Sequence, residues 1–241
     1  MERRKFLQGA GMAAILAAGT APAIVHAQQQ IRWRLASSFP KSLETVFGAS
    51  EAFAKYVSDA TGGKFVISVH PGGELVPPFG VVDAVQQGTI DAAEWIGPYD
   101  DLKLGLHKVA QHYYFPAWWE GSTQFSVYIN DKQWNGLSAE YKAIVEQASR
   151  AAHVTCQARY DGRNPGSLKQ LIAEGAKLSR FPKDFMDAAF KASREVYAEL
   201  NEKNANWKKV YPDYSRFLAD QVQWESVAEG NYAQYLASQK L

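Results

Sequence analysis

The chain has 241 residues, of which 46% are hydrophobic and 21% are charged, and its formal net charge at pH 7 is +1. This composition allows one or two modest hydrophobic cores, and a near-neutral charge without a basic block argues against nucleic acid as a partner. The single cysteine, Cys156, excludes an internal disulfide. It lies at helical spacing from Ala148 and Ala152, so we interpret it as a core thiol.

The first 27 residues have the features of an export signal. An Arg-Arg-Lys-Phe-Leu sequence at 3–7 precedes an apolar, small-residue segment, and Val25-His26-Ala27 is a small-x-Ala cleavage site. The segment is too short to span a membrane and is typical of a secretory signal. The twin arginine predicts export by the Tat route, with an ordinary Sec signal as the alternative. We expect cleavage after Ala27 and a periplasmic mature protein with a net charge of −1, because the signal carries three basic residues and one acid.

Strand and helix patterns alternate in the segment that follows. Period-two alternation predicts strands over residues 31–35 and 65–69, and apolar residues at three- and four-residue spacing predict a helix over residues 43–60. A further helix is predicted between Pro77 and Gly88. This order is typical of an α/β sheet with right-handed crossovers.

A short strand is predicted next, over residues 90–95, and the turn signal Gly97-Pro98 ends it. Glu94 is an acid inside this otherwise apolar run, with Trp95 beside it. A carboxylate there must face water or meet a cation or a hydrogen-bond donor, because unpaired burial is costly.

Tyr99, Asp100 and Asp101 add a phenol and two more acids at the end of this predicted strand. Ligands of α/β sheets bind at the carboxyl ends of strands. Together with Glu94, these residues predict a ligand or cation site. The alternative is an exposed strand edge with solvated acids.

The rest of the chain is predicted to be mainly helical. Short strands are predicted at 113–115 and 125–129, followed by amphipathic helices at 139–157 and 185–200 and a final helix after Pro212. No apolar run after the signal is long enough to cross a bilayer.

The sequence contains no recognisable catalytic motif. Its histidines show no paired metal-ligand spacing, and it has neither a Gly-x-Ser-x-Gly elbow nor a glycine-rich phosphate loop. We therefore predict that the protein is not an enzyme, and an exported enzyme of unknown type is the alternative.

Two stretches resemble a known protein family. The run from Thr89 to Asp101, with Tyr-Tyr-Phe-Pro-Ala-Trp-Trp-Glu-Gly at 113–121, is similar to the second lobe of DctP-type solute-binding proteins of TRAP (tripartite ATP-independent periplasmic) transporters. It most resembles the subgroup that captures 2-oxoacids and related monocarboxylates. Trp-Arg-Leu-Ala-Ser-Ser-Phe-Pro at 33–40 resembles the N-terminus of the same family. The resemblance implies an α/β fold of the two-lobe periplasmic solute-binding protein type.

The resemblance also implies a binding site. In the subgroup, the Glu-Trp pair that matches Glu94 and Trp95 helps to hold a metal cation, sodium or calcium, which bridges to the substrate carboxylate. Ser38 and Phe39 match a loop that faces the cleft, with a turn residue and a helix staple as the alternative roles. The expected substrate contacts are Ser38, Phe39, Trp95 and Tyr99, and the expected metal contacts are Glu94 and Trp95.

The sequence departs from the family near Gly88. Both lobes of such proteins contain a helix, then Gly-Thr, then a strand, and here residues 82–89 match the first occurrence while residues 88–92 match the second. The block between them is absent, and with it the arginine that pairs with the substrate carboxylate in such proteins. No arginine between Arg34 and Arg150 replaces it. We interpret the junction as an internal deletion, with a compact natural variant as the alternative.

The expected organisation is therefore an incomplete two-lobe fold. We predict a Tat-like signal peptide at 1–27, a partial first lobe at 28–88, a partial second lobe at 89–130, and a helical C-terminal part at 131–241 that packs on both lobes.

The predicted function is that of the periplasmic substrate-binding component of a TRAP transporter. The protein would capture a 2-oxoacid or another monocarboxylate with a bridging cation and deliver it to membrane permease subunits. We also expect a homodimer through the C-terminal helix. The alternative is an internally deleted, non-binding remnant, and without the arginine the chain is expected to bind monocarboxylates poorly or not at all.

Overall fold

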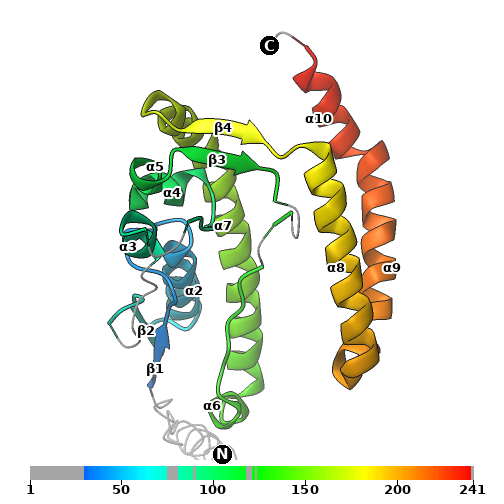
Figure 1. Cartoon of the computed structure of the whole chain (residues 1–241). Helices are drawn as coiled ribbons and strands as arrows, with labels where there is room; N and C mark the ends of the chain where they lie inside the picture. The colour runs from blue at the N-terminus through cyan, green and yellow to red at the C-terminus, as the bar shows by residue number, and fades with distance from the viewer. Residues whose placement is uncertain (1–29, 75–80, 89–90, 118–120, 123, 240–241) are drawn as a thin grey trace, which may run out of the picture. The chain divides into compact units, whose positions relative to one another are not determined.

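The computed structural model describes residues 30–74, 81–88, 91–117, 121–122 and 124–239 (Figure 1). The predicted signal peptide and its cleavage site lie outside these residues. The chain divides into two compact units. Unit 1 takes its described residues from Met1–Gly80 and Tyr128–Pro165, and unit 2 takes them from Val81–Val127 and Gly166–Leu241. The predicted lobe boundaries stay a prediction.

A parallel pair of strands forms the sheet of unit 1. β1 (Ile31–Ala36) pairs with β2 (Phe65–His70), and α2 (Phe47–Ala60) connects them. Both predicted strands are therefore confirmed. Phe65 is fully buried and packs edge-to-face on Trp33, with ring centroids 4.7 Å apart, so alternate residues of the two strands build one core.

The helix α2 begins later than predicted. Residues 41–46 form turns, yet Leu43 and Val46 are buried as the helical spacing indicated. Gly62 and Gly63 end the helix with φ angles of 56° and 77°, which favour glycine over other residues. The predicted helix stop is therefore confirmed.

Two helices of the C-terminal part follow, α6 (Asp131–Asn135) and α7 (Ala139–Ala173). Ser138 caps α7, because its hydroxyl oxygen accepts a hydrogen bond from the amide of Tyr141 at 3.2 Å. The helix continues past the predicted end at residue 157 and includes Pro165, where the two units divide.

One face of α7 completes the core of unit 1. Its buried members are Tyr141, Val145, Ala148 and Ala152. Cys156, one turn further on, is only half-buried, and its thiol donates to the carbonyl oxygen of Thr45 at 3.6 Å. Cys156 therefore lies at the margin of the core rather than inside it.

Unit 2 contains three short helices and a second parallel pair of strands. The helices are α3 (Val81–Gln86), α4 (Pro98–Leu104) and α5 (Leu106–Val109), and the strands are β3 (His112–Phe115) and β4 (Lys177–Arg180). The strand predicted at the position of β3 is confirmed.

Two predicted strands are wrong. Residues 91–96 and 124–130 have no strand structure, although their apolar residues follow a strand-like pattern. A strand requires backbone hydrogen bonds to a neighbour. In the part of the chain that the structure describes, each sheet has two strands that pair only with each other.

Three helices close the chain: α8 (Lys183–Lys203), α9 (Ala205–Val227) and α10 (Glu229–Ala237). Figure 1 shows α8 beside α9. The side chain of Asn204 caps α9 by accepting hydrogen bonds from two backbone amides at 3.0 Å each. The expected start after Pro212 is therefore wrong, because the cap begins the helix earlier and Pro212 lies inside it. Among the helices described, none combines the length and apolar character that a membrane span needs.

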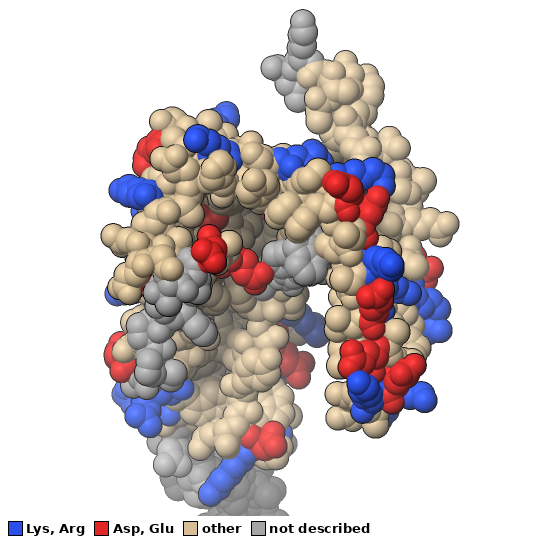
Figure 2. All heavy atoms as spheres, viewed as in Figure 1, with Lys and Arg blue, Asp and Glu red and all other residues tan. Residues whose placement is uncertain are grey.

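The helix α8 carries a charged face and an apolar face. Acidic and basic side chains follow one another along it in Figure 2, paired one turn apart as Lys183–Asp187, Lys191–Glu195 and Glu199–Lys203. On the apolar side, the rings of Tyr197, Trp207 and Tyr211 lie with centroids 5.1–5.4 Å apart and join α8 to α9. Aromatic contacts therefore hold α8 and α9 together.

Candidate functional site

Glu94 and Trp95 lie in the irregular segment that leads into α4. Glu94 is exposed, whereas Trp95 is half-buried. The indole Nε1 of Trp95 is buried and has no hydrogen-bond partner among the residues that the structure describes. A buried donor without an acceptor is costly and is relieved when an acceptor binds. The pair therefore offers an exposed carboxylate and an unsatisfied donor.

The two acids in the first turn of α4 are buried. Asp100 and Asp101 are 0% and 5% exposed. The hydroxyl of Tyr113 donates to Oδ2 of Asp101 at 2.6 Å. Burial raises the pKa of Asp101 to about 6, although the Tyr113 hydroxyl and the backbone of Gly97 and Ile96 act in the opposite direction. The alternative of solvated acids at this position is therefore wrong for both aspartates.

Tyr99 lines a pocket of about 410 Å³ in unit 2. Its walls come from α4, α5 and the last turns of α7, and its lining includes Tyr99, Lys103, His107, Lys108, Gln170 and Glu174. Neither Glu94 nor Trp95 lines this pocket. Tyr99 therefore lines this pocket without the other two predicted residues of unit 2.

A buried histidine lies in the wall of this pocket. Nε2 of His107 is 2.8 Å from Oε2 of Glu174, and Gln170 donates to Oε1 of the same carboxylate at 2.7 Å. The hydrogen bond from Gln170, and then that from His107, lowers the pKa of Glu174. Because this carboxylate is the acceptor, Nε2 is the donor. Nδ1 is buried and has no partner in the described part of the chain.

The sequence did not predict this histidine–glutamate pair. His107 and Glu174 are 67 positions apart, and α7, which ends just before Glu174, was predicted to end near residue 157. The spacing of Gln170 and Glu174, one helical turn apart, is the only local signal that could have indicated that the two lie on one helix face.

Ser38 and Phe39 lie in the loop after β1, in unit 1. Ser38 is exposed and Phe39 is half-buried. The carbonyl oxygen of Phe39 accepts from the amide of Gly72 at 2.8 Å, and a Cβ at Gly72 would lie 2.6 Å from the carbonyl oxygen of Ser38. A glycine at 72 therefore lets the turn after β2 hold this loop closely. The predicted contact of Ser38 and Phe39 with the substrate stays a prediction.

Residues 79–204, more than half of the chain, match the family model described as bacterial extracellular solute-binding protein, family 7 (DctP). The chain belongs to this family. The resemblance to TRAP transporter solute-binding proteins is thereby confirmed. The family 7 match contains Glu94, Trp95 and Tyr99, and it begins after the loop of Ser38 and Phe39.

A curated relative is similar to a large part of this family 7 chain. The monocarboxylate 2-oxoacid-binding periplasmic protein of Nostoc sp. strain PCC 7120 is 40% identical over 172 residues, which are 71% of this chain and 46% of that protein. The chain thus spans about half the length of the curated relative that it matches.

Solved structures of TRAP solute-binding proteins are also similar. One from Bordetella bronchiseptica RB50, with calcium and picolinate bound, is 30% identical, with a TM-score of 0.80 over 87% of this chain and 98% of that chain. Another from Pseudoalteromonas atlantica T6c, with bound sodium and pyruvate, is 19% identical, with a TM-score of 0.77 over 88% of this chain and 100% of that chain. The predicted α/β fold of the periplasmic solute-binding protein type is therefore confirmed, as is its helix-rich C-terminal part.

A metal ion at Glu94 would need more ligands than the described residues bring together. Calcium takes about six to eight oxygen ligands. Among those residues, no group of three His, Cys, Asp or Glu side chains could hold an ion. Glu94 supplies one carboxylate, so the donor set fits a cation only where solute and water oxygens complete it.

Proposed function

We propose that this family 7 chain is the periplasmic substrate-binding component of a TRAP transporter. It captures a small organic acid, a 2-oxoacid or another monocarboxylate, and delivers it unchanged to membrane permease subunits. The observation that carries the proposal is the 40% identity to the monocarboxylate 2-oxoacid-binding protein of Nostoc. The Bordetella protein, 30% identical and holding calcium and the monocarboxylate picolinate, supports the same solute class.

In this proposal, Glu94 and Trp95 contact a sodium or calcium ion, and Ser38, Phe39, Trp95 and Tyr99 contact the solute. The exposed carboxylate of Glu94 supports the first assignment, because hard cations prefer oxygen ligands. The unpaired indole N–H of Trp95 is a donor that a solute carboxylate would satisfy. The position of Tyr99 in a pocket wall supports its contact with a small molecule.

We further propose export by the Tat route, cleavage after Ala27 and residence in the periplasm. The twin arginine and the Val25-His26-Ala27 site support the route and the cleavage. The periplasmic relative in Nostoc supports the location. A catalytic role is not part of this proposal, because solute capture requires binding and release only.

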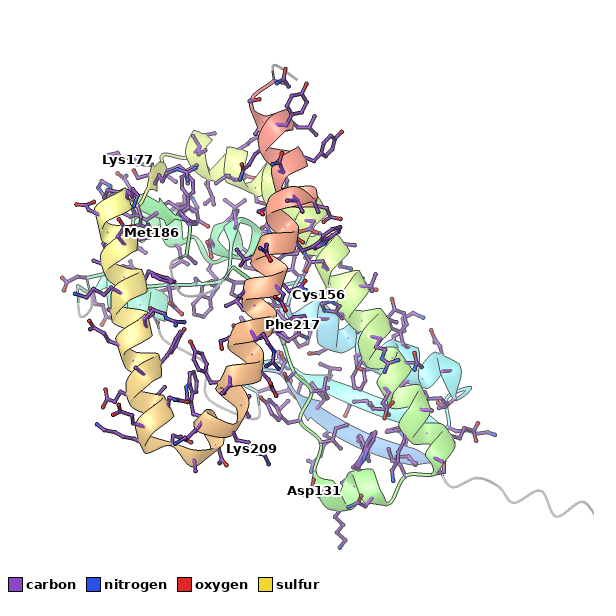
Figure 3. The ribbon with its side chains drawn as sticks, turned by 90° about the vertical axis from the view of Figure 1, so that its right-hand side faces the viewer. Asp131, Cys156, Lys177, Met186, Lys209 and Phe217 are labelled. Carbon is purple, nitrogen blue, oxygen red and sulfur yellow. The ribbon has the colours of Figure 1, made fainter. Side chains whose placement is uncertain are left out.

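The helices α8, α9 and α10 are the proposed dimer interface. They carry large apolar side chains that are between 59% and 72% exposed, among them Phe190, Phe217, Trp224, Val227 and Tyr235. Figure 3 labels Phe217 on α9. Large apolar patches of this kind mark interaction surfaces. A second copy of the chain would cover the apolar surface of α8, α9 and α10. The Bordetella structure, which is a dimer, supports this partner.

A second candidate is an internally deleted remnant that no longer binds solute. The lack of arginine between Arg34 and Arg150 favours it, as does the irregular backbone at 91–96, where a strand was predicted.

Calorimetric titration of the purified full chain with pyruvate and calcium distinguishes the two candidates. Weak but saturable binding that glucose does not reproduce supports solute capture. The absence of saturable heat supports the remnant. Micromolar binding would contradict the internal deletion, because loss of the arginine partner is expected to weaken affinity by orders of magnitude.

A further inference from the structure

The pocket of about 410 Å³ in unit 2 is not used by the proposed cation and solute contacts, apart from Tyr99. Its volume lies in the range of small-molecule sites. All of its walls belong to unit 2, since α7 contributes only residues beyond Pro165. The chemistry of its lining therefore indicates what it could hold.

The charged side chains at this pocket that form no ion pair are positive, although the charge of Lys108 also helps to lower the pKa of Glu174. Lys103 and Lys108 are exposed, and neither forms an ion pair with a carboxylate among the residues described. Lys103 lies over the ring of Tyr99, 5.5 Å from its centroid. Both oxygens of Glu174, the pocket's one acid, already accept hydrogen bonds from His107 and Gln170. A ligand thus meets two ammonium groups and one carboxylate, whose oxygens already accept hydrogen bonds from the protein.

The buried imidazole of His107 also favours a negatively charged ligand. The side chain of His107 is 3% exposed, and its Nε2 donates to Glu174. Nδ1 is buried and has no partner among the described residues. With Nε2 as the donor to Glu174, Nδ1 is an acceptor in the neutral ring and a donor only when the ring carries both protons. An oxyanion in the pocket would supply the acceptor for that second N–H.

We propose that this pocket binds a small oxyanion, a carboxylate or an inorganic phosphate. Lys103 and Lys108 attract it, the ring of Tyr99 forms a wall, and Nδ1–H of His107 donates to it. Glu174 and Gln170 hold the imidazole in place. The lining includes neither Glu94 nor Trp95 but shares Tyr99 with the proposed solute contacts, so the Lys103→Gln/Lys108→Gln variant is what assigns binding to this pocket.

Titration of the full chain with inorganic phosphate, and separately with acetate, tests the proposal at constant ionic strength set by chloride. Binding of either oxyanion should saturate. The double variant Lys103→Gln/Lys108→Gln should weaken it at least about tenfold, because hydrogen bonds to charged groups contribute that much. Both lysines are exposed, so the variant should fold, which circular dichroism checks. Saturation by phosphate alone would assign a phosphate site, and saturation by both a general oxyanion site.

A matched variant sharpens the result. Lys169→Gln removes an exposed lysine next to Gln170 that does not line the pocket, and it should leave oxyanion binding unchanged. The proposal is overturned if neither oxyanion saturates, or if the Lys103→Gln/Lys108→Gln variant binds as tightly as Lys169→Gln.

Discussion

Tyr113 donates its phenolic hydrogen to the carboxylate of Asp101 at 2.6 Å, which ties β3 to the first turn of α4. Asp101 is 5% exposed, and its Oδ1 has no partner in the described part of the chain. The carboxylate is therefore poorly solvated, and burial is the main reason why its pKa rises to about 6. The stability of unit 2 should consequently depend on pH.

The free energy of unfolding should fall as the pH rises from about 4 to about 6. The pKa of Asp101 is above its ordinary value of 3.8, so the folded chain keeps a proton that the unfolded chain has lost. This contribution, about 3 kcal/mol, is fully present below the lower value and is lost as the pH rises through the upper one. Urea unfolding at several pH values measures it.

The variant Asp101→Asn isolates this effect. It keeps an acceptor for Tyr113 but cannot titrate, so the pH dependence between 4 and 6 should become smaller. Asp220→Asn, at an exposed position of α9, should retain the wild-type profile. Identical profiles for wild type and Asp101→Asn would contradict the assignment.

Tyr113→Phe should lower the free energy of unfolding at pH 7 by about 1.5–3 kcal/mol, the range for a hydrogen bond to a charged group. The Tyr113 hydroxyl lowers the pKa of Asp101, so its loss should move the pH transition upward. Tyr128→Phe, at a residue that is 94% exposed, is the control and should change neither quantity. Equal losses in both variants would show that the hydroxyl of Tyr113 has no special role.

Local sequence patterns predicted the helices and strands that are determined by the burial pattern of their own residues. Alternation predicted β1 and β2, and helical spacing predicted most of α2, α7 and α8, because both patterns depend only on which face is buried. The same rule failed at residues 125–129, where Phe125, Val127 and Ile129 alternate but pair with no strand in the part of the chain that the structure describes. A strand depends on its neighbour, which periodicity does not indicate.

The candidate site was predicted less completely for a similar reason. Glu94 was singled out as an acid inside an apolar run with Trp95 beside it, but the roles of both residues were implied by the family resemblance and stay a prediction. The burial of Asp101 depends on Tyr113, and the pairing of His107 depends on Glu174, 67 positions later. These contacts arise from tertiary packing, so no spacing in the sequence indicates them.

Phe217→Glu should disrupt the proposed dimer. Phe217 is 64% exposed on α9, and a carboxylate there would be buried without a partner in the interface. Sedimentation velocity at several protein concentrations should show a concentration-dependent dimer for the wild type and a monomer for the variant. Gln223→Glu adds the same charge at an exposed position of α9 that does not share the face of Phe217, and it should still dimerise. A wild type that stays monomeric at every concentration would rule out this interface.

Solute capture through Glu94 is tested most directly by calorimetric titration of the full chain with pyruvate, with and without calcium. Glu94→Gln keeps the shape of the side chain but removes its charge, and Glu51→Gln changes an exposed acid on α2 as the control. The account predicts weak, calcium-dependent binding that Glu94→Gln reduces by about tenfold or more and Glu51→Gln leaves unchanged, as expected for the loss of a charged partner. Equal affinity in all three proteins, or no dependence on calcium, would contradict it.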